Sequence, residues 1–307
     1  MSPIYISREV DPYFNIASEY QLLSEANEEV NLYLWQNQPC VVIGRNQNIY
    51  AECNVDYLEK SHILPVRRFS GGGAVFQDFG NMNFTFITKE EYSNNMIFVE
   101  IIKKALSSFG INCSFSGRND LIYEGKKISG HASYCENQNY MYHGTIMVNV
   151  NLDMLVNVLK PSYIKLSSKG INSVRSRVVN LSQINNNITE KKLKEALLKE
   201  FFDVYGDTPI RFINKENMQP LLYEKISQDK WIYGESPEFG ICIGKKLSKG
   251  NVTIYTEVED GIIKNIKIYT DSLLIVDFSK LEKYLIGTLY RESDLFEQIN
   301  KFFRNKN

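Results

Sequence analysis

A run of three glycines behind two arginines is the stretch of this sequence best suited to chemistry. It reads Arg67-Arg68-Phe69-Ser70-Gly71-Gly72-Gly73-Ala74-Val75-Phe76. Because glycine has no side chain and tolerates positive φ, consecutive backbone N–H groups can lie against an anionic ligand. The arginines add planar donors that suit phosphate or carboxylate. The run therefore predicts an anion cradle between strands, although an ordinary turn also fits the glycines taken alone.

A lysine in a predicted hairpin is the second candidate. The segment reads Asp120-Leu121-Ile122-Tyr123-Glu124-Gly125-Lys126-Lys127-Ile128-Ser129-Gly130, with a Glu-Gly turn between two short β runs. A lysine on a rigid strand can hold a carboxylate and a phosphate together and bear part of the charge that develops when they react. Lys127 is thus a candidate catalytic residue, against the background that most lysines are solvated surface residues.

Two more reactive side chains follow. His143, one of three histidines, begins a predicted strand over residues 142–150. Most histidines are hydrogen-bonded structural residues, so His143 taken alone is predicted to be one of these and not to transfer protons. Cys135 lies between these motifs, and a loop thiol near a lysine becomes a nucleophile when its pKa is lowered. The residues alone leave a cysteine-dependent acyltransferase open.

A basic loop is predicted between residues 169 and 181. It contains Lys169, Gly170, Ser173 and Arg175. Glycine, serine and arginine suit a loop that an anionic ligand orders, and a basic surface loop is the alternative.

Hydrophobic spacing predicts the elements that must hold these residues. Apolar residues recur at helical spacing in some segments, whereas alternating or β-branched runs favour strands in others. The predicted helices cover residues 16–23, 55–60, 94–109, 152–159 and 189–205. The predicted strands outside the hairpin of Lys127 include residues 31–35, 40–44, 63–66 and 83–87. After residue 246 a β-hairpin, residues 250–258 and 262–269, precedes helices over residues 278–285 and 293–303.

Length and composition exclude several classes of protein. A chain of 307 residues suits one large domain and a small one. Its 35 Lys and Arg against 36 Asp and Glu create no global field for nucleic acid or an anionic membrane. Five cysteines without a CxxC pair indicate reduced thiols and not a disulfide framework or zinc site. With no signal-like N-terminus and no apolar run of about 18 residues, the expected location is cytoplasmic.

Taken in order, these stretches resemble the motifs of the lipoate–protein ligases, a branch of the biotin/lipoate protein ligase family. The resemblance rests on Arg-Arg-x-Ser-Gly-Gly-Gly-Ala-Val with a following Asp-x-Gly-Asn, on Lys-Lys-Ile-Ser-Gly, on His-Gly-Thr-Ile and on residues 169–181. It covers nearly the whole chain. Two positions depart from the family pattern: Gln77 stands where the family has His, and His131 stands where it has the second Ser of Ser-Gly-Ser-Ala.

The resemblance implies an α+β fold with two parts. Residues 1–243 would form a large mixed-sheet catalytic domain that binds lipoate and ATP, and residues 246–307 a small α+β accessory domain. A monomer is expected.

The resemblance also implies a two-step ligation with ATP and Mg²⁺. Lipoate would form lipoyl-AMP, and a lysine of an acceptor protein, an E2 subunit of a 2-oxoacid dehydrogenase or the glycine cleavage H protein, would then take the lipoyl group. Lys127 would be catalytic and bind both ATP and lipoate. Further ATP contacts are implied for Arg68, Gly73, Ala74, Val75 and Phe76. Further lipoate contacts are implied for Ser70, Gly71, Gly72 and His143. The loop with Lys169, Gly170, Ser173 and Arg175 would cover the adenylate, and the metal ligands are unassigned.

Three alternatives stay open at this point. A cysteine acyltransferase of the same fold would use Cys135 and no ATP. Biotin ligation is disfavoured, because that branch has a different glycine-arginine loop. A non-catalytic lipoyl-binding protein, which the departures at Gln77 and His131 allow, would bind ligand without releasing pyrophosphate.

Overall fold

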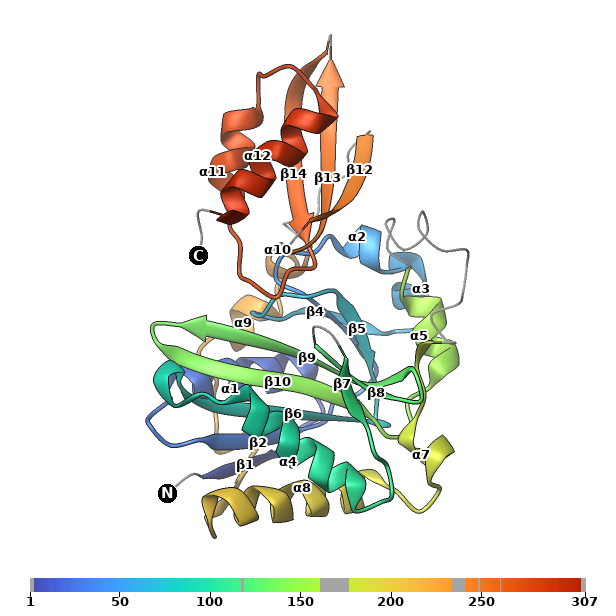
Figure 1. Ribbon diagram of the computed structural model, residues 1–307, viewed down its shortest axis with the longest axis vertical. Coiled ribbons are helices and arrows are strands. Elements are labelled where there is room, and N and C mark those ends of the chain that lie inside the picture. Colours follow the sequence, from blue (N-terminus) through green and yellow to red (C-terminus); the bar gives the residue numbers. More distant parts are fainter. Residues whose placement is uncertain are drawn as a thin grey trace.

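A mixed sheet of eight strands forms the base of the large domain (Figure 1). The computed structural model describes residues 3–116, 119–160, 177–233, 241–247, 249–259 and 261–304. In sheet order the strands are β11 (Ile210–Ile213), β1 (Ile4–Ser7), β2 (Asn31–Trp35), β6 (Asn81–Lys89), β10 (Asn139–Met147), β9 (Lys126–Glu136), β8 (Asp120–Tyr123) and β7 (Ser114–Ser116). β1 is parallel to both of its neighbours, and the pairs from β2 to β7 are antiparallel. The expected mixed-sheet α+β class is confirmed.

A second sheet carries the glycine run. It has three strands, in the order β4 (Leu64–Arg67), β3 (Cys40–Ile43) and β5 (Ala74–Gln77). Helix α1 (Pro12–Ser24) has Asp11 as its N-cap, and its buried residues share one core with residues of β2, β3, β4 and β6. Helix α1 therefore packs against strands of both sheets and joins them in one core.

Helices cover the outer faces of both sheets. α4 (Asn95–Ser107) and α8 (Glu190–Tyr205) pack on the large sheet through Phe98, Leu193 and other apolar residues of one core. Another core, on the far side of the small sheet, joins β3 and β5 to α3 (Val55–Lys60) and α5 (Leu152–Val158). The shorter helices are α2 (Ile49–Glu52), α7 (Leu181–Ile184), α9 (Tyr223–Ile226), α10 (Asp229–Ile232) and the 3₁₀ turn η1 (Glu90–Tyr92).

The C-terminal domain has a sheet and a core of its own. β12 (Ile241–Leu247), β13 (Gly250–Glu259) and β14 (Ile262–Thr270) form an antiparallel sheet. α11 (Ser279–Leu285) and α12 (Glu292–Arg304) cover one face of it, as Figure 1 shows. The domain boundary expected between residues 243 and 246 falls inside β12, because the whole of that strand pairs with β13.

Local predictions agree with these elements to within a few residues. The helices expected over residues 94–109 and 189–205 are α4 and α8, and the C-terminal hairpin is β13 with β14. Among the described residues, no helix is both long and apolar enough to cross a bilayer.

Candidate active site

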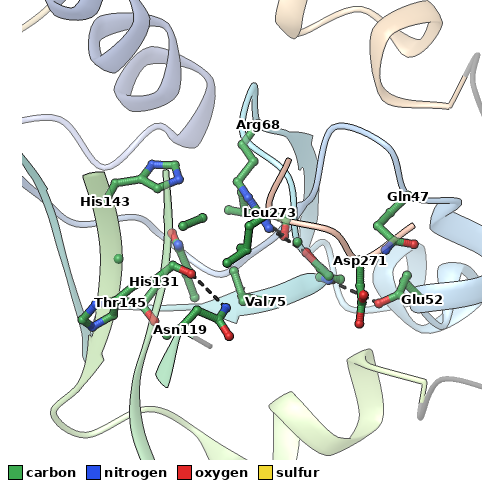
Figure 2. Close-up of a pocket in the computed structure, with 18 of the residues that line it drawn as sticks. Gln47, Glu52, Arg68, Val75, Asn119, His131, His143, Thr145, Asp271 and Leu273 are labelled. Carbon is green, nitrogen blue, oxygen red and sulfur yellow. Dashed lines mark hydrogen bonds between the residues drawn. The ribbon is translucent and has the colours of Figure 1, made fainter. Parts of the chain in front are cut away.

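One cavity of about 250 Å³ lies where the two sheets meet the C-terminal domain. Its wall takes residues from α1, β5, β6, β9, β10 and the glycine run, together with residues of β13, β14 and the segment after β14. Figure 2 shows labelled side chains from both domains around it, among them Arg68, His143, Glu52, Asp271 and Leu273. Side chains from residue 52 to residue 273 of the sequence are thus gathered around one cavity.

Lys127 enters this cavity beside a carboxylate. Its Nζ lies 2.8 Å from Asp120 Oδ1, and about a third of each side chain is exposed. A β-bulge sets its direction: Ile122 of β8 pairs with Lys127 and Leu121 with Ser129, so Ile128 is an extra residue. With one residue bulged out, Lys127 and Gly130 face the same side of the sheet. A Cβ atom on Gly130 would lie only 2.5 Å from Lys127 Nζ, which explains why a glycine follows the lysine at this spacing.

Arg68 holds the glycine run in place through hydrogen bonds. Its Nη2 donates to the carbonyl oxygens of Gly71 at 2.6 Å and Gly73 at 2.9 Å, and its Nε donates to Ser70 Oγ at 3.0 Å. Burial lowers the pKa of Arg68 to about 10, which leaves it cationic at neutral pH. The guanidinium, at 8% exposure, therefore fixes the conformation of the run and adds positive charge to the cavity wall.

The glycine run also packs against the C-terminal domain. Gly72 has φ = +95°, and its N–H donates to the carbonyl oxygen of Ser272 at 3.1 Å. A Cβ on Gly71 would lie 2.3 Å from that same oxygen. One amide of the predicted anion cradle is thus bonded to the C-terminal domain, and two of the three glycines are required by conformation or close approach.

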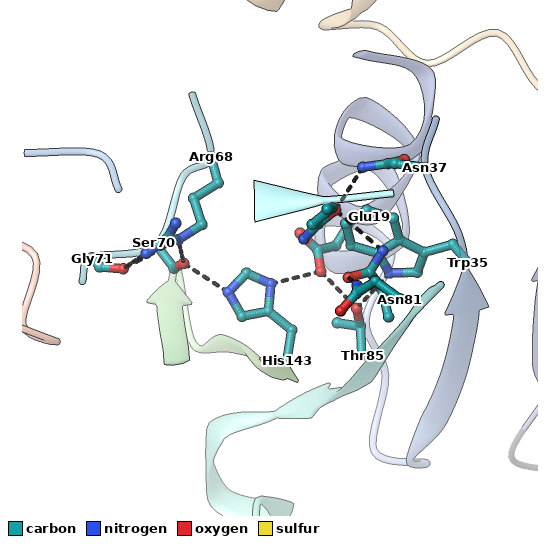
Figure 3. A network of polar contacts seen from close by, with 11 residues as sticks. Glu19, Trp35, Asn37, Arg68, Ser70, Gly71, Asn81, Thr85 and His143 are labelled. Carbon is teal, nitrogen blue, oxygen red and sulfur yellow. Dashed lines mark hydrogen bonds and ion pairs between the residues drawn. The ribbon is translucent and has the colours of Figure 1, made fainter. Parts of the chain in front are cut away.

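A buried polar chain supports the run from the side of α1 (Figure 3). Glu19, 1% exposed, accepts from Thr85 Oγ1 at 2.6 Å and contacts His143 Nδ1 at 2.7 Å. Since a carboxylate only accepts, His143 carries its proton on Nδ1, and in the neutral ring Nε2 accepts from Ser70 Oγ at 2.7 Å. Ser70 in turn accepts from Arg68. The donors and acceptors of this chain are complementary, so Glu19 orients His143, and His143 orients Ser70.

His131 occupies a second buried position in the wall. Its Nε2 lies 2.7 Å from Ser129 Oγ, and its Nδ1 is hydrogen-bonded with the Tyr142 hydroxyl. Burial and the nearby Lys127 charge lower the pKa of His131 to about 3. His131 is therefore a neutral hydrogen-bonding residue, and Lys127 and Arg68 supply the positive charge.

Most of the predicted ligand contacts line the cavity. The cavity-lining ones are Arg68, Gly72, Gly73, Ala74, Val75, Lys127 and His143. Ser70, Gly71 and Phe76 do not line it: Ser70 is fully buried under His143, Gly71 lies against Ser272, and Phe76 packs into the core beneath β5. The predicted adenylate loop, with Lys169, Gly170, Ser173 and Arg175, lies outside the described residues.

Several cavity residues were missed from the sequence. They include Glu19, Glu52, Asn119, Thr145 and, from the C-terminal domain, Asp271 and Leu273. Thr145 lies within the His-Gly-Thr-Ile motif. Glu19 also left a signal, because it lies on the apolar face of α1, one turn after Ile16, where a charged residue needs a buried partner.

Cys135 does not belong to the site. It is absent from the cavity wall, and eight residues of extended β9 separate it from Lys127, about 27 Å at the rise of a strand. Burial and Glu90 raise its thiol pKa to about 11, which disfavours the thiolate. The geometry gives no support to a cysteine nucleophile.

Comparison with known proteins assigns the family. The lipoyl protein ligase A/B catalytic domain family matches residues 11–202. The chain belongs to this family. A second family, the bacterial lipoate protein ligase C-terminus, matches residues 236–307, so the chain carries the ligase domain and its accessory domain.

Individual relatives extend the comparison over the whole chain. The lipoate-protein ligase LplJ of Bacillus subtilis is 36% identical, over 94% of this chain and 92% of the relative. The crystal structure of LipL1 of P. falciparum in complex with lipoate superimposes with a TM-score of 0.77 at 28% identity, covering 99% of this chain and all of that one. A lipoate-protein ligase A bound with ATP covers 76% of this chain and 99% of its own, with a TM-score of 0.65 at 22% identity, and shares the fold.

Proposed function

We propose that this member of the lipoyl ligase family activates free lipoate with ATP and transfers the lipoyl group to a lysine of an acceptor protein. The observation that carries the proposal is the position of Lys127, whose ammonium faces the same cavity as Arg68 and the glycine run. Two cationic side chains and backbone amides in one partly enclosed cavity suit the meeting of a carboxylate with a phosphate.

The first step forms lipoyl-AMP. A lipoate carboxylate oxygen attacks the α-phosphorus of ATP, the bond from that phosphorus to the bridging oxygen breaks, and pyrophosphate leaves. Lys127 holds the carboxylate and the α-phosphate together and neutralises the charge that builds between them. Asp120, at 2.8 Å, positions the Lys127 ammonium before the ligands bind.

The second step transfers the acyl group. The ε-amine of the acceptor lysine attacks the acyl carbon, the acyl–oxygen bond to AMP breaks, and the amine releases a proton to solvent. The acceptors proposed for this chain are the lipoyl domains of E2 subunits and the glycine cleavage H protein, each of which presents such a lysine. We propose that the ligase acts as a monomer.

Mg²⁺ fits this cavity as an ion that ATP brings. No group of three or more His, Cys, Asp or Glu side chains arranged to hold a metal occurs in the described part of the chain. Mg²⁺ at nucleotide sites needs only one or two carboxylates beside phosphate oxygens, and Glu52 and Asp271 both line the cavity (Figure 2). They would hold an ion that neutralises the pyrophosphate leaving group.

Pyrophosphate release tests the proposal. With ATP, Mg²⁺ and lipoate, the wild-type protein should release pyrophosphate, and Lys127→Ala should lower that rate by about a hundredfold or more, because transition-state charge loses its partner. Cys135→Ala is the matched control and should keep the wild-type rate.

Two outcomes would contradict the proposal. Normal release by a folded Lys127→Ala protein removes Lys127 from the mechanism. No release by the wild type, together with tight lipoate binding, makes the protein a non-catalytic lipoyl-binding protein.

A further inference from the structure

Gln77 is a buried amide in the wall of the cavity, at a position where the family pattern has His. It ends β5, is 3% exposed and lines the cavity. Its Oε1 accepts from Asn37 Nδ2 at 2.8 Å and from Asn83 Nδ2 at 3.3 Å. Both asparagines donate to the oxygen of the amide, so the orientation of Gln77 depends on which way their nitrogens point.

That orientation is fixed by backbone groups further back. Asn15 Nδ2 donates to the carbonyl oxygens of Glu9 and Gln36, each at 3.0 Å, and to Asn37 Oδ1 at 2.9 Å. A backbone carbonyl only accepts, so the Asn15 amide cannot be reversed. Asn37 then turns its oxygen toward Asn15 and its nitrogen toward Gln77. Figure 3 includes Asn37 in this network.

The remaining end of Gln77 is a donor without a protein partner. No hydrogen bond of Nε2 occurs among the described residues. Nε2 is also not among the fully enclosed side-chain atoms without a hydrogen-bond partner in this part of the chain, so it is not sealed inside the protein. It therefore reaches the cavity and presents N–H groups to the ligand.

The sheet register separates this donor from Lys127. The Lys127 ammonium lies over Gly130, Gly130 pairs with Thr145, and Thr145 pairs with Asn83, which contacts Gln77. Two strand spacings are about 10 Å, so Lys127 and Gln77 do not bind the same small group. An extended lipoate spans roughly 7–9 Å from its carboxyl carbon to its ring sulfurs at the rise per bond of an extended chain.

We propose that Gln77 determines specificity by donating a hydrogen bond to a dithiolane sulfur of lipoate while Lys127 holds the carboxylate. The inference rests on the proposed function. Sulfur is a weak hydrogen-bond acceptor, whereas octanoate has no acceptor at this end and would place methylene groups against the amide. A site built around a donor rejects an analogue that leaves this donor unpaired. The ligase therefore prefers lipoate over octanoate by roughly tenfold in kcat/KM.

Pyrophosphate release with each acid tests this. Gln77→Met removes the donor, and the ratio of kcat/KM for lipoate to that for octanoate should fall by roughly tenfold, to near one. Gln77→Glu keeps an acceptor for Asn37 and Asn83 but turns a carboxylate oxygen toward the ring, so KM for lipoate should rise about tenfold or more, and more than KM for octanoate. If the Met variant does not fold, the Glu variant carries the test.

Asn37→Ala tests the orientation of the amide. It removes the shorter of the two hydrogen bonds to Gln77 Oε1, so the ratio should fall in the same direction as in Gln77→Met but by less. Cys135→Ala, which lies outside the cavity wall, is the control and should keep the wild-type ratio. A wild type without preference for lipoate, Gln77 variants that keep the wild-type ratio, or an equal change in Cys135→Ala would overturn the inference. Absence of pyrophosphate release with either acid would instead refute the proposed function.

Discussion

At the scale of single residues, the site depends on small distances that glycine makes available. Gly130 leaves room for the Lys127 ammonium, and Gly44 leaves room for the carbonyl oxygen of Gly72, which a Cβ would approach to 2.0 Å. These glycines serve the packing of neighbouring groups, in addition to any contact with a ligand. At Gly130 an added methyl group would meet a flexible side chain, whereas at Gly44 it would meet a fixed backbone carbonyl. The balance between lost activity and lost stability should therefore differ between the two alanine variants.

Gly130→Ala should lower activity more than stability. The new methyl group displaces the end of the flexible Lys127 side chain, so the fold adapts, but the ammonium leaves its position beside Asp120. We expect kcat/KM for pyrophosphate release to fall by about tenfold or more, since a displacement of this size misaligns the reacting groups. Gly110→Ala, at φ = +75° after α4, is the matched control and should lower thermal stability without changing kcat/KM. Equal kinetic losses in both variants would contradict this view.

His131 should make the fold sensitive to acid. Its pKa of about 3 in the folded state is below the value of 6.5 for an exposed histidine, so the unfolded chain binds the extra proton between these pH values. Stability is therefore complete above pH 6.5 and is lost as the pH falls toward 3. Between pH 6.5 and 5 the wild type should lose about 1–2 kcal/mol more unfolding free energy than His131→Gln. Urea denaturation at both pH values measures the difference, and parallel losses in the two proteins would exclude this role.

At the scale of elements, a buried arginine joins the small sheet to its neighbours. Arg67 is fully buried at the end of β4. It donates to the carbonyl oxygens of Gly44 at 3.0 Å, Gln47 at 2.6 Å and Ile232 at 2.6 Å. The Trp231 indole returns a bond to the Arg67 carbonyl at 2.9 Å. β4, the loop after β3 and helix α10 are thus held together by one side chain.

Arg67→Lys should show the importance of this junction. Lysine lacks the planar fork of donors and leaves several buried carbonyl groups unpaired, so unfolding free energy should fall by about 2–4 kcal/mol. Arg45→Lys is the control, because Arg45 is held mainly by its stacking over Trp231 at 4.6 Å, and it should cost less than about 1 kcal/mol. Urea denaturation compares the two. Similar losses would mean that the carbonyl contacts of Arg67 contribute little.

At the scale of the whole molecule, the C-terminal domain completes the cavity. The segment after β14 places Ser272 on the glycine run and Leu273 in the cavity wall.

Gly71→Ala would bring its Cβ to 2.3 Å from the Ser272 carbonyl, and both groups are fixed in the backbone. The variant should therefore loosen the domain contact, with faster hydrogen exchange over residues 272–277 and a lower Tm. Gly73→Ala, whose Cβ would make only an ordinary contact with Glu52 at 3.4 Å, should leave both unchanged. Unchanged exchange in Gly71→Ala would show that the contact does not restrain the segment.

The sequence by itself determined the local elements and the chemistry of the motifs. The glycine run lies between strands, Lys127 stands in a hairpin, and the C-terminal hairpin precedes two helices, as predicted. These features depend on short-range spacing of apolar residues, glycines and turn residues, which a sequence displays directly.

Only the tertiary structure decided which partner each of these residues has. The bulge at Ile128 sets the direction of the Lys127 side chain, and Glu19 contacts His143, 124 positions away in the sequence. The Ser272 carbonyl accepts a hydrogen bond from an amide of the glycine run. The direction of Gln77 is set by Asn15 and Asn37 in the same manner. A buried polar group pairs with a group that packing brings within about 3 Å. The distance between the two groups along the sequence does not indicate which pair will form.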